Sequence, residues 1–465
     1  MTVEVMTCEK KADGLPMPRR IWAVLAISIT LMMSVLDASI ANVVLPTFSK
    51  DFGTTPSLTI WIMNAYLLAL IVSLLSFSSL GDIYGYRRVY LSGVGLFCIT
   101  SLVCALSDSF WMLVGARALQ GLGAAAITGV NAAQLRTIYP AKYLGRGLAI
   151  NAMVVAVSAV AGPTVAGAVL AIADWHWLFA MNLPMGAAAL IMGALFLPKR
   201  EMRRDRRFDK KAAVANALTF GLLIYSIEGF AHHESPWLLA ILLMLLVVVA
   251  TWYIRDQLHK ENPLLPVDLM KIPIFSLSVV TSVCSFTAQM LALISLPFFF
   301  QDSLGRNEIE TGLLITPWPV AILFAAPAAG YLVERIHAGL LGGIGMFILA
   351  TGLYLLYALS EAPSNMDIIW RMAVCGVGFG LFQTPNNSTI ISSAPPSRSG
   401  GASGMLGTAR LLGQTLGASL VAILFSYIPH AQSTRVCLLA ALFFSVIAGV
   451  VSCLRLSRRM PLKRD

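Results

Sequence analysis

Long apolar segments separated by short polar connections dominate the amino-acid sequence. Each segment is of about the length needed for a helix to cross a hydrocarbon core of about 30 Å at about 1.5 Å per residue. Their approximate limits are 21–46, 59–80, 89–107, 110–134, 147–172, 177–197, 212–230, 236–254, 274–300, 309–333, 339–359, 367–391, 401–428 and 435–454. The pattern predicts an all-α polytopic membrane protein of fourteen spans, with antiparallel neighbours wherever the connection is short.

The composition agrees with this fold class. Only 12% of the 465 residues are charged, 57% are hydrophobic, and the mean hydropathy is +0.78. A soluble protein carries about 25% charged residues. A soluble enzyme is therefore excluded, and the protein core should be the bundle of spans itself.

The basic residues are distributed unevenly between the two sides of the predicted bundle. Of the 33 Lys and Arg residues, 27 fall in the tails and in the connections on the side of the N-terminus. The other six are three in the opposite loops and three within spans: Lys50, Arg306 and Arg435, then Arg117, Arg371 and Arg410. This asymmetry predicts that both termini are cytoplasmic. The net charge of +10 thus indicates basic connections beside lipid headgroups rather than a nucleic-acid-binding protein. We interpret the densest block, residues 199–207, as a topogenic loop near anionic lipid.

A weak internal repeat runs through the chain at an offset of 251–254 residues. The equivalent positions include Asp82 with Glu334, Arg117 with Arg371, and Gly162 with Gly413. The repeat predicts two related six-span halves, with two further spans inserted between them. The predicted divisions are a tail at 1–20, the first half at 21–198, a basic loop and two inserted spans at 199–272, the second half at 273–456, and a tail at 457–465.

Asp37 is the only ionisable residue between positions 21 and 46. A carboxylate in a span costs roughly 2.5–3.5 kcal/mol on insertion scales, so it survives beside a partner or water, or by taking up a proton. We interpret it as a proton-coupling group; the alternative is a structural acid satisfied by a neighbouring helix. Its equivalent in the second half is Gln289, which cannot titrate, so proton handling should belong to the first half.

Arg117 lies in the fourth span on a stripe of polar and small residues. Gln120 and Asn131 fall within about 100° of it around a helix, which turns the stripe toward the bundle interior. The alternative is a packing stripe of small residues, but a buried arginine needs an acid, a carbonyl or water. We expect Asp37 to be its electrostatic partner.

Glu228, in the seventh span, is a second membrane acid. It lies near the predicted outer end of that span, where we expect it to be solvated and of less importance than Asp37. The adjacent His232 and His233 are interpreted as an exposed loop, and the seven cysteines show no metal spacing. The sequence therefore predicts no metal site.

Two motifs point to a known family. Residues 80–88 (LGDIYGYRR) resemble the loop signature G-x-L-x-D-R-x-G-R-[RK] of the major facilitator superfamily; Asp82 and Gly85 are kept, whereas Ile83 replaces the first arginine. Residues 36–46 (LDASIANVVLP) resemble L-D-x-T-I-V-N-V-A-L-P of the fourteen-span drug:proton antiporters. Three further stretches carry the same resemblance: 117–123, 162–167, which is the antiporter motif, and 175–184.

The resemblance implies a major facilitator fold with two pseudo-symmetric six-helix halves and two extra central helices. It implies a proton-driven exporter without cofactor, in a bacterial inner membrane, taking amphipathic, often cationic drugs or antiseptics from the cytoplasm by alternating access, with a monomer favoured. A dedicated exporter of one endogenous metabolite or lipid remains an alternative, as does a membrane receptor or sensor. An enzyme is disfavoured, because no G-x-x-x-x-G-K-[ST], H-E-x-x-H or G-x-S-x-G motif occurs and no loop is long enough for a catalytic domain.

Residues of three kinds are candidates for the transport cycle. Proton coupling is assigned to Asp37 and Arg117. The expected lining of the substrate cavity is Asn42, Tyr66, Gln120, Asn131, Gln289, Trp318, Gln383 and Asn387. The expected conformational set is Asp82, Gly85, Arg88, Gly162, Pro163, Glu334 and Arg146. Within this set, Asp82 should meet the start of the thirteenth span near residues 400–403, and Glu334 should meet Arg146 in a mirror contact.

Overall fold

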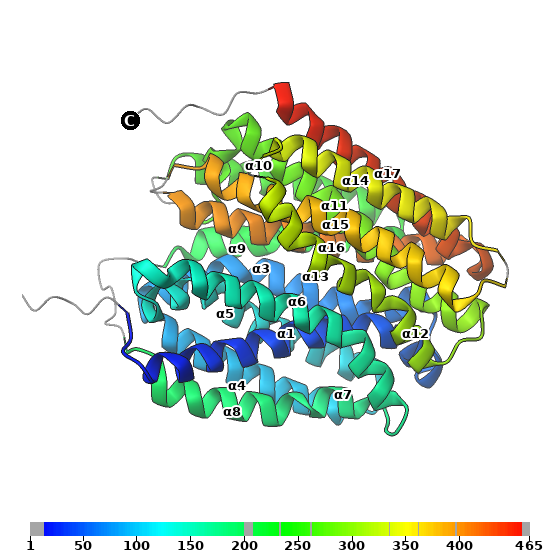
Figure 1. Ribbon diagram of the computed structural model, residues 1–465, viewed down its shortest axis with the longest axis horizontal. Coiled ribbons are helices and arrows are strands. Elements are labelled where there is room, and N and C mark those ends of the chain that lie inside the picture. Colours follow the sequence, from blue (N-terminus) through cyan, green and yellow to red (C-terminus); the bar gives the residue numbers. More distant parts are fainter. Residues whose placement is uncertain are drawn as a thin grey trace, which may run out of the picture.

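The structure is a computed structural model of the chain, which describes residues 14–199, 208–231, 234–260, 263–333, 335–360, 362–395 and 398–457. Over these residues the regular structure is helical throughout (Figure 1). Thirteen helices within them are long and apolar enough to cross a membrane. The helix α15, Asn365–Ser393, lies where the sequence predicts the remaining span, and its polar residues lower its hydropathy. The predicted polytopic all-α fold is confirmed.

The helices follow the predicted spans in order. The first six spans are α1 (Arg19–Asp51), α2 (Pro56–Thr59) with α3 (Trp61–Tyr84), α4 (Tyr86–Ala105), α5 (Phe110–Ile138), α6 (Leu144–Leu170), and α7 (His176–Ala180) with α8 (Asn182–Phe196). The next two are α9 (Lys210–Ala231) and α10 (Pro236–Leu258). The last six are α11 (Pro273–Phe298), α12 (Glu308–Ile315) with α13 (Pro317–Leu332), α14 (Ala338–Tyr357), α15, α16 (Ser399–Tyr427) and α17 (His430–Leu454). Short helical turns are η1 (Ala141–Tyr143), η2 (Val267–Lys271), η3 (Phe299–Ser303) and η5 (Arg455–Ser457).

Proline and glycine mark the places where helix limits differ from the predicted ones. The first span does not close at Pro46, because α1 continues through it to Asp51. The tenth span divides just before Pro317, which begins α13. Gly85 separates α3 from α4 with a φ of 96°, a backbone conformation that glycine adopts without steric cost.

The same five helix pairings occur in both sets of six spans. In the first set, α5 packs against α3 and α4, α1 against α6 and α8, and α4 against α8. In the second set, α15 packs against α13 and α14, α11 against α16 and α17, and α14 against α17. Figure 1 shows the first set in the lower part of the view and the second in the upper part. This pattern supports the division into halves that we propose from the repeat.

The two halves are joined by contacts at the end of the bundle where α1 terminates, which we call the far end. Lys50 forms an ion pair of 3.4 Å with Asp302. Ser57 on α2 donates a hydrogen bond of 2.9 Å to the carbonyl of Ala422 on α16. The helices α6 and α12 also meet there. In this structure, therefore, the halves are closed against each other at the far end.

The inserted helix α9 lies on the seam between the halves. It packs against α3 of the first half, α16 of the second half, and α10. By contrast, α10 packs mainly on α9, and most of its surface is exposed. Within the described residues, the extensive contacts of the two inserted helices with both halves are therefore those of α9.

Candidate functional site

The buried pair of Asp37 and Arg117 is the centre of the candidate site. Asp37 comes from α1 and is 3% exposed, whereas Arg117 comes from α5 and is fully buried. Nη1 of Arg117 donates a hydrogen bond to Oδ2 of Asp37 in an ion pair between these helices. The pairing expected from the sequence is present in the structure.

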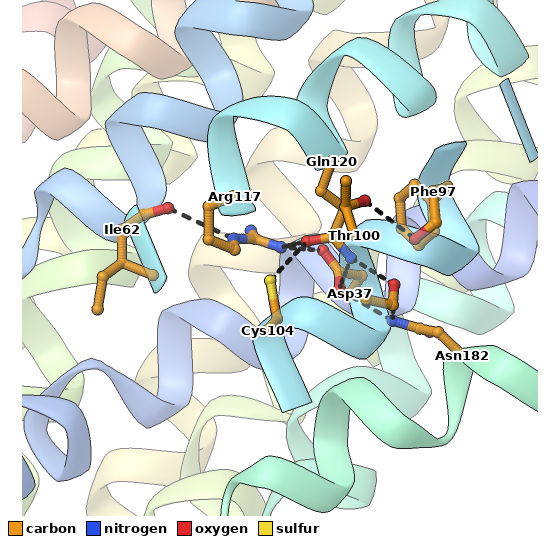
Figure 2. Close-up of polar contacts among 9 residues, drawn as sticks. Asp37, Ile62, Phe97, Thr100, Cys104, Arg117, Gln120 and Asn182 are labelled. Atoms are coloured by element: carbon orange, nitrogen blue, oxygen red, sulfur yellow. Dashed lines mark hydrogen bonds and ion pairs between the residues drawn. The ribbon is translucent and has the colours of Figure 1, made fainter. Parts of the chain in front are cut away.

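Two amides complete the coordination of the carboxylate (Figure 2). Gln120 Nε2 and Asn182 Nδ2 each donate a hydrogen bond of 3.1 Å to Oδ1 of Asp37. Gln120 Oε1 in turn accepts a hydrogen bond of 2.7 Å from Arg117 Nη1, and Ser101 Oγ accepts one of 2.8 Å from Gln120. Four helices, α1, α4, α5 and α8, thus supply this group, which we call the Asp37 cluster.

The guanidinium of Arg117 is also held from the side of α3. Its Nε donates a hydrogen bond of 3.4 Å to the carbonyl of Ile62, and its Cζ lies 4.3 Å from the centre of the Tyr66 ring. The Phe179 ring centre is 5.7 Å away on another side. Such ring contacts are attractive for a cation that has lost its water.

A buried ion pair of this kind is held by its neighbours more than by its own attraction. Desolvation of both charges offsets much of the Coulomb gain, while removal of one partner leaves an uncompensated charge that costs about 3–5 kcal/mol. Neutralising Asp37 by a proton would likewise remove the main partner of Arg117.

The Asp37 cluster includes three residues beyond the predicted pair: Gln120, Asn182 and Ser101. Gln120 was expected to line the cavity, but it is fully buried between Asp37 and Arg117. Asn182 and Ser101 were not singled out. Asn182 does fall in the family-like stretch 175–184, which was a usable signal, whereas nothing in the local sequence distinguishes Ser101 from other span serines.

The other expected cavity residues are spread over the bundle. Tyr66 and Trp318 are buried at 2% and 0% exposure, Asn42 and Gln289 are buried, and Asn131, Gln383 and Asn387 are partly exposed. Asn131 Nδ2 donates a hydrogen bond of 3.0 Å to Asn151 of α6. Tyr66 is the member of this group that contacts the Asp37 cluster. The assignment of the others to a cavity stays a prediction.

Close helix approach explains the antiporter-like motif on α6. A side chain at Gly162 would collide with Ser39 on α1, and a side chain at Gly312 on α12 would collide with the carbonyl of Pro163. Thr164 and Thr316 share a hydrogen bond of 2.9 Å at the same level. This part of α6 therefore packs on α1 within its own half and on α12 across the seam.

The remaining residues expected to control conformation lie at the opposite end from these contacts. Asp82 Oδ1 accepts a hydrogen bond of 2.5 Å from the hydroxyl of Tyr86, and Arg88 is exposed. Arg146 is also exposed, with its Cζ 5.2 Å from the Tyr143 ring centre. Glu334 lies outside the described residues. The contacts predicted for Asp82 with the start of α16 and for Glu334 with Arg146 stay predictions.

Glu228 is buried, so the expectation that it is solvated is wrong. It is 1% exposed and accepts a hydrogen bond from Asn64 Nδ2 of α3. Asn64 Nδ2 also lies 3.3 Å from Ser419 Oγ of α16. The position of Glu228 near the end of α9 suggested access to water, but the packing of α9 between α3 and α16 removes that access. His232 and His233 lie outside the described residues.

The chain is similar in sequence to known proteins over most of its length. A family model described as Major Facilitator Superfamily matches residues 27–418 and 278–464. Over 449 residues, 96% of this chain and 98% of the relative, the sequence is 56% identical to "Uncharacterized transporter YebQ" of Escherichia coli (strain K12). It is 31% identical over 401 residues, 85% of this chain and 74% of the relative, to "Multidrug resistance protein Stp" of Mycobacterium tuberculosis. It is 29% identical over 421 residues, 89% and 76% of the two chains, to "Tetracenomycin C resistance and export protein" of Streptomyces glaucescens.

Solved structures share the fold. A bacterial homologue of the lysosomal transporter Spinster, in an inward-facing and unoccupied conformation, matches with a TM-score of 0.67 and 15% identity over 95% of this chain and 97% of its own. A POT family transporter in complex with a thioalcohol-conjugated peptide matches with a TM-score of 0.71, also at 15% identity, over 94% and 95% of the two chains. At this identity the likeness concerns the arrangement of helices alone.

Proposed function

This chain belongs to the Major Facilitator Superfamily, a family of membrane transporters rather than enzymes, and we propose that it is a proton-coupled exporter of amphipathic small molecules. The proposed location is the cytoplasmic membrane of a bacterium, with both termini inside. Export of drugs or antiseptics, including cationic ones, is the form of this function that the motifs favour. The names of the relatives from Mycobacterium tuberculosis and Streptomyces glaucescens support it.

The Asp37 cluster is the observation that carries the proposal. It places one titratable carboxyl group at the contact of four helices of the first half, held by three donors and closed to bulk water. The second half has Gln289 at the equivalent position, which cannot exchange a proton. One proton site is sufficient for a cycle that exchanges a proton for a substrate.

The proposed cycle uses the two halves as rigid bodies. With the N-terminal end of the bundle in the cytoplasm, the far end faces outside, and the state seen here is closed to the outside. Substrate enters from the cytoplasm while Asp37 is ionised and paired with Arg117. After the halves rock and the far end opens, a proton reaches Asp37, releases Arg117 and lowers the affinity for substrate, which leaves. Return of the halves releases the proton inside.

Two alternatives are distinguished by measurement. A dedicated metabolite exporter would move one compound of a chemically varied panel rather than several. A receptor or sensor would bind its ligand without moving protons.

The test is transport by the purified protein in proteoliposomes with an imposed pH gradient. The probes are ethidium and rhodamine 123 as cations and fluorescein as an anion, and an internal pH dye reports proton movement. We expect gradient-dependent accumulation and substrate-stimulated proton flux, both lost in Asp37→Asn, while dye exchange without a gradient persists. Accumulation by Asp37→Asn at the wild-type level, or wild-type transport that ignores the gradient, would contradict proton coupling at Asp37.

A further inference from the structure

Arg410 is a cation within a span to which neither the Asp37 cluster nor the far-end contacts assign a role. It is the twelfth residue of α16, about 17 Å from the start of a helix about 44 Å long. Despite this depth its side chain is exposed, while its chain neighbours Ala409 and Leu411 are 2% and 3% exposed. Arg410 therefore projects into a solvent-accessible space deep in the membrane-spanning part of the protein.

The packing of α16 shows which way Arg410 points. Gly413 and Gly417 press on α11, because added Cβ atoms would lie 2.5 Å from the Val283 carbonyl and 2.6 Å from Met290 Cβ. Gly407 faces α3, where an added Cβ would lie 3.3 Å from Leu74 Cδ2. At about 100° per residue, Arg410 lies about 60° from Gly413 on one side and about 60° from Gly407 on the other.

Arg410 is thus directed between α11 and α3, which belong to opposite halves. This direction is the interior of the bundle rather than the lipid. The side chain interacts electrostatically with Tyr66 of α3, the residue whose ring lies against Arg117. Arg410 of the second half and Arg117 of the first half therefore both interact with Tyr66.

Arg410 has no hydrogen bond or ion pair with any other residue in the described part of the chain. The two other span arginines differ from it in this respect: Arg117 is paired with Asp37, and Arg371 with Asp367 at 3.0 Å. An unpaired charge within a membrane is costly and marks a substrate or ion pathway. Because Asp37 is already neutralised by Arg117, Arg410 is an interior charge that remains available to a ligand.

We propose that Arg410 binds an anionic group, a carboxylate or a similar oxyanion, on the transported molecule. This proposal rests on the proposed transport function and specifies its substrate class. A guanidinium offers a planar set of N–H donors that matches a carboxylate in two parallel hydrogen bonds. The buried Phe286 and Met290, on the α11 face that meets α16, give the apolar part of an amphipathic molecule a surface nearby.

The proposal changes the charge preference expected from the sequence. An unpaired Asp37 would favour the binding of cationic substrates. Because Asp37 is ion-paired with Arg117 while Arg410 is exposed, the site favours amphipathic anions or zwitterions. The two charges also lie in different halves, so an anion held by Arg410 against Tyr66 would contact both halves at once.

The first test measures the local potential beside Arg410 without needing a known substrate. Cysteine at Gln414, one turn further along α16, is modified in the otherwise complete chain by two small methanethiosulfonates, one carrying a sulfonate and one a trimethylammonium group. The ratio of the two rates cancels effects of access and thiol ionisation, and the parent chain without this cysteine gives the background. We expect Arg410→Gln to lower the anion-to-cation ratio about tenfold. Arg371→Gln, which removes a paired arginine from the same half, should leave the ratio unchanged.

The second test concerns ligand choice. Fluorescein and rhodamine 123 share a ring frame and differ in charge, and their binding to protein in nanodiscs is followed by fluorescence polarisation. We expect preference for fluorescein in the wild type and in Arg410→Lys, and loss of that preference in Arg410→Gln.

The outcomes separate this proposal from the transport proposal. An unchanged rate ratio and an unchanged dye preference in Arg410→Gln would overturn the anion site, even if proton-driven transport is intact. An Arg410-dependent ratio and preference would support the anion site, even if transport ignores the pH gradient. If Arg410→Gln weakens the binding of both dyes equally and leaves the ratio of modification rates unchanged, Arg410 has a structural role. That result would also overturn the proposal.

Discussion

The guanidinium of Arg117 lies 4.3 Å from the centre of the Tyr66 ring, so the cation that pairs with Asp37 is also held by the face of an aromatic side chain from α3. The strength of this contact can be measured by varying the ring. Tyr66→Phe keeps the π face and should melt close to the wild type. Tyr66→Leu should lose about 2 kcal/mol or more of stability, because the contact is desolvated. Melting of the purified protein in detergent reports this difference; equal loss in both variants would show that the hydroxyl group, not the ring face, is what matters.

Removing either charge of the Asp37–Arg117 pair should destabilise the protein. Arg117→Leu leaves a carboxylate in a buried site and should cost about 3–5 kcal/mol. Asp37→Asn combined with Arg117→Leu should recover part of that loss, since no unpaired charge remains. Melting temperatures of the two single variants and the double variant form the cycle. Additive losses would mean that the two side chains are not energetically coupled.

Gly312 is predicted to be essential for closure of the far end. Gly312→Ala places a methyl group against the carbonyl of Pro163, so α12 and α6 must separate. Spin labels at positions 50 and 302, which carry an ion pair of the two halves at this end, should move apart in Gly312→Ala. Gly330→Ala, in the same span as Gly312, is the matched control. Its new Cβ would contact only Thr384 of α15, at 3.8 Å. Identical label distances in the two variants would argue against Gly312 as a closure point.

Glu228 is predicted to fasten α9 to the seam rather than to carry the transported proton. Glu228→Gln keeps an acceptor for Asn64 and should keep gradient-driven transport. Glu228→Ala should destabilise the protein by about 1–3 kcal/mol, because it leaves a buried donor without this acceptor. Both variants are compared by melting and by proton flux in proteoliposomes. Loss of proton flux in Glu228→Gln with normal melting would instead make Glu228 part of the proton path.

Apolar periodicity was sufficient to predict the number and order of the spans, because each must satisfy its own backbone within a helix. The pairing of Asp37 with Arg117 was also predictable, since each needs a partner in a medium without water. The contacts between helices could not be predicted. Ser101 joins the Asp37 cluster only because α4 packs against α5 and α8. The same limit explains Glu228, whose burial depends on α9 lying between α3 and α16.

The direction of Arg410 shows a further limit. The sequence placed this arginine within a span but did not distinguish it from Arg371, which is equally intramembrane. The difference arises from glycines around α16 that fix which of its faces meet α3 and α11. A helix wheel becomes informative about a charged residue only when the neighbours of the helix are known.

The position of α9 makes the two long seams between the halves mechanically unequal. On one side, the seam of α3 and α16 is covered by a third helix that contacts both; on the other, α6 meets α12 and α13 directly. When the halves rock, α9 must slide against at least one of them. Glu228 of α9 accepts a hydrogen bond from Asn64 of the first half, and the carbonyls of Ala231 and Phe230 accept hydrogen bonds from Ser426 and Tyr427 of the second half. We expect the covered seam to be the stiffer of the two, so that the seam of α6 with α12 and α13 opens more widely toward the lipid. An amphipathic molecule dissolved in one leaflet would therefore find its side entrance along α6, not along α9.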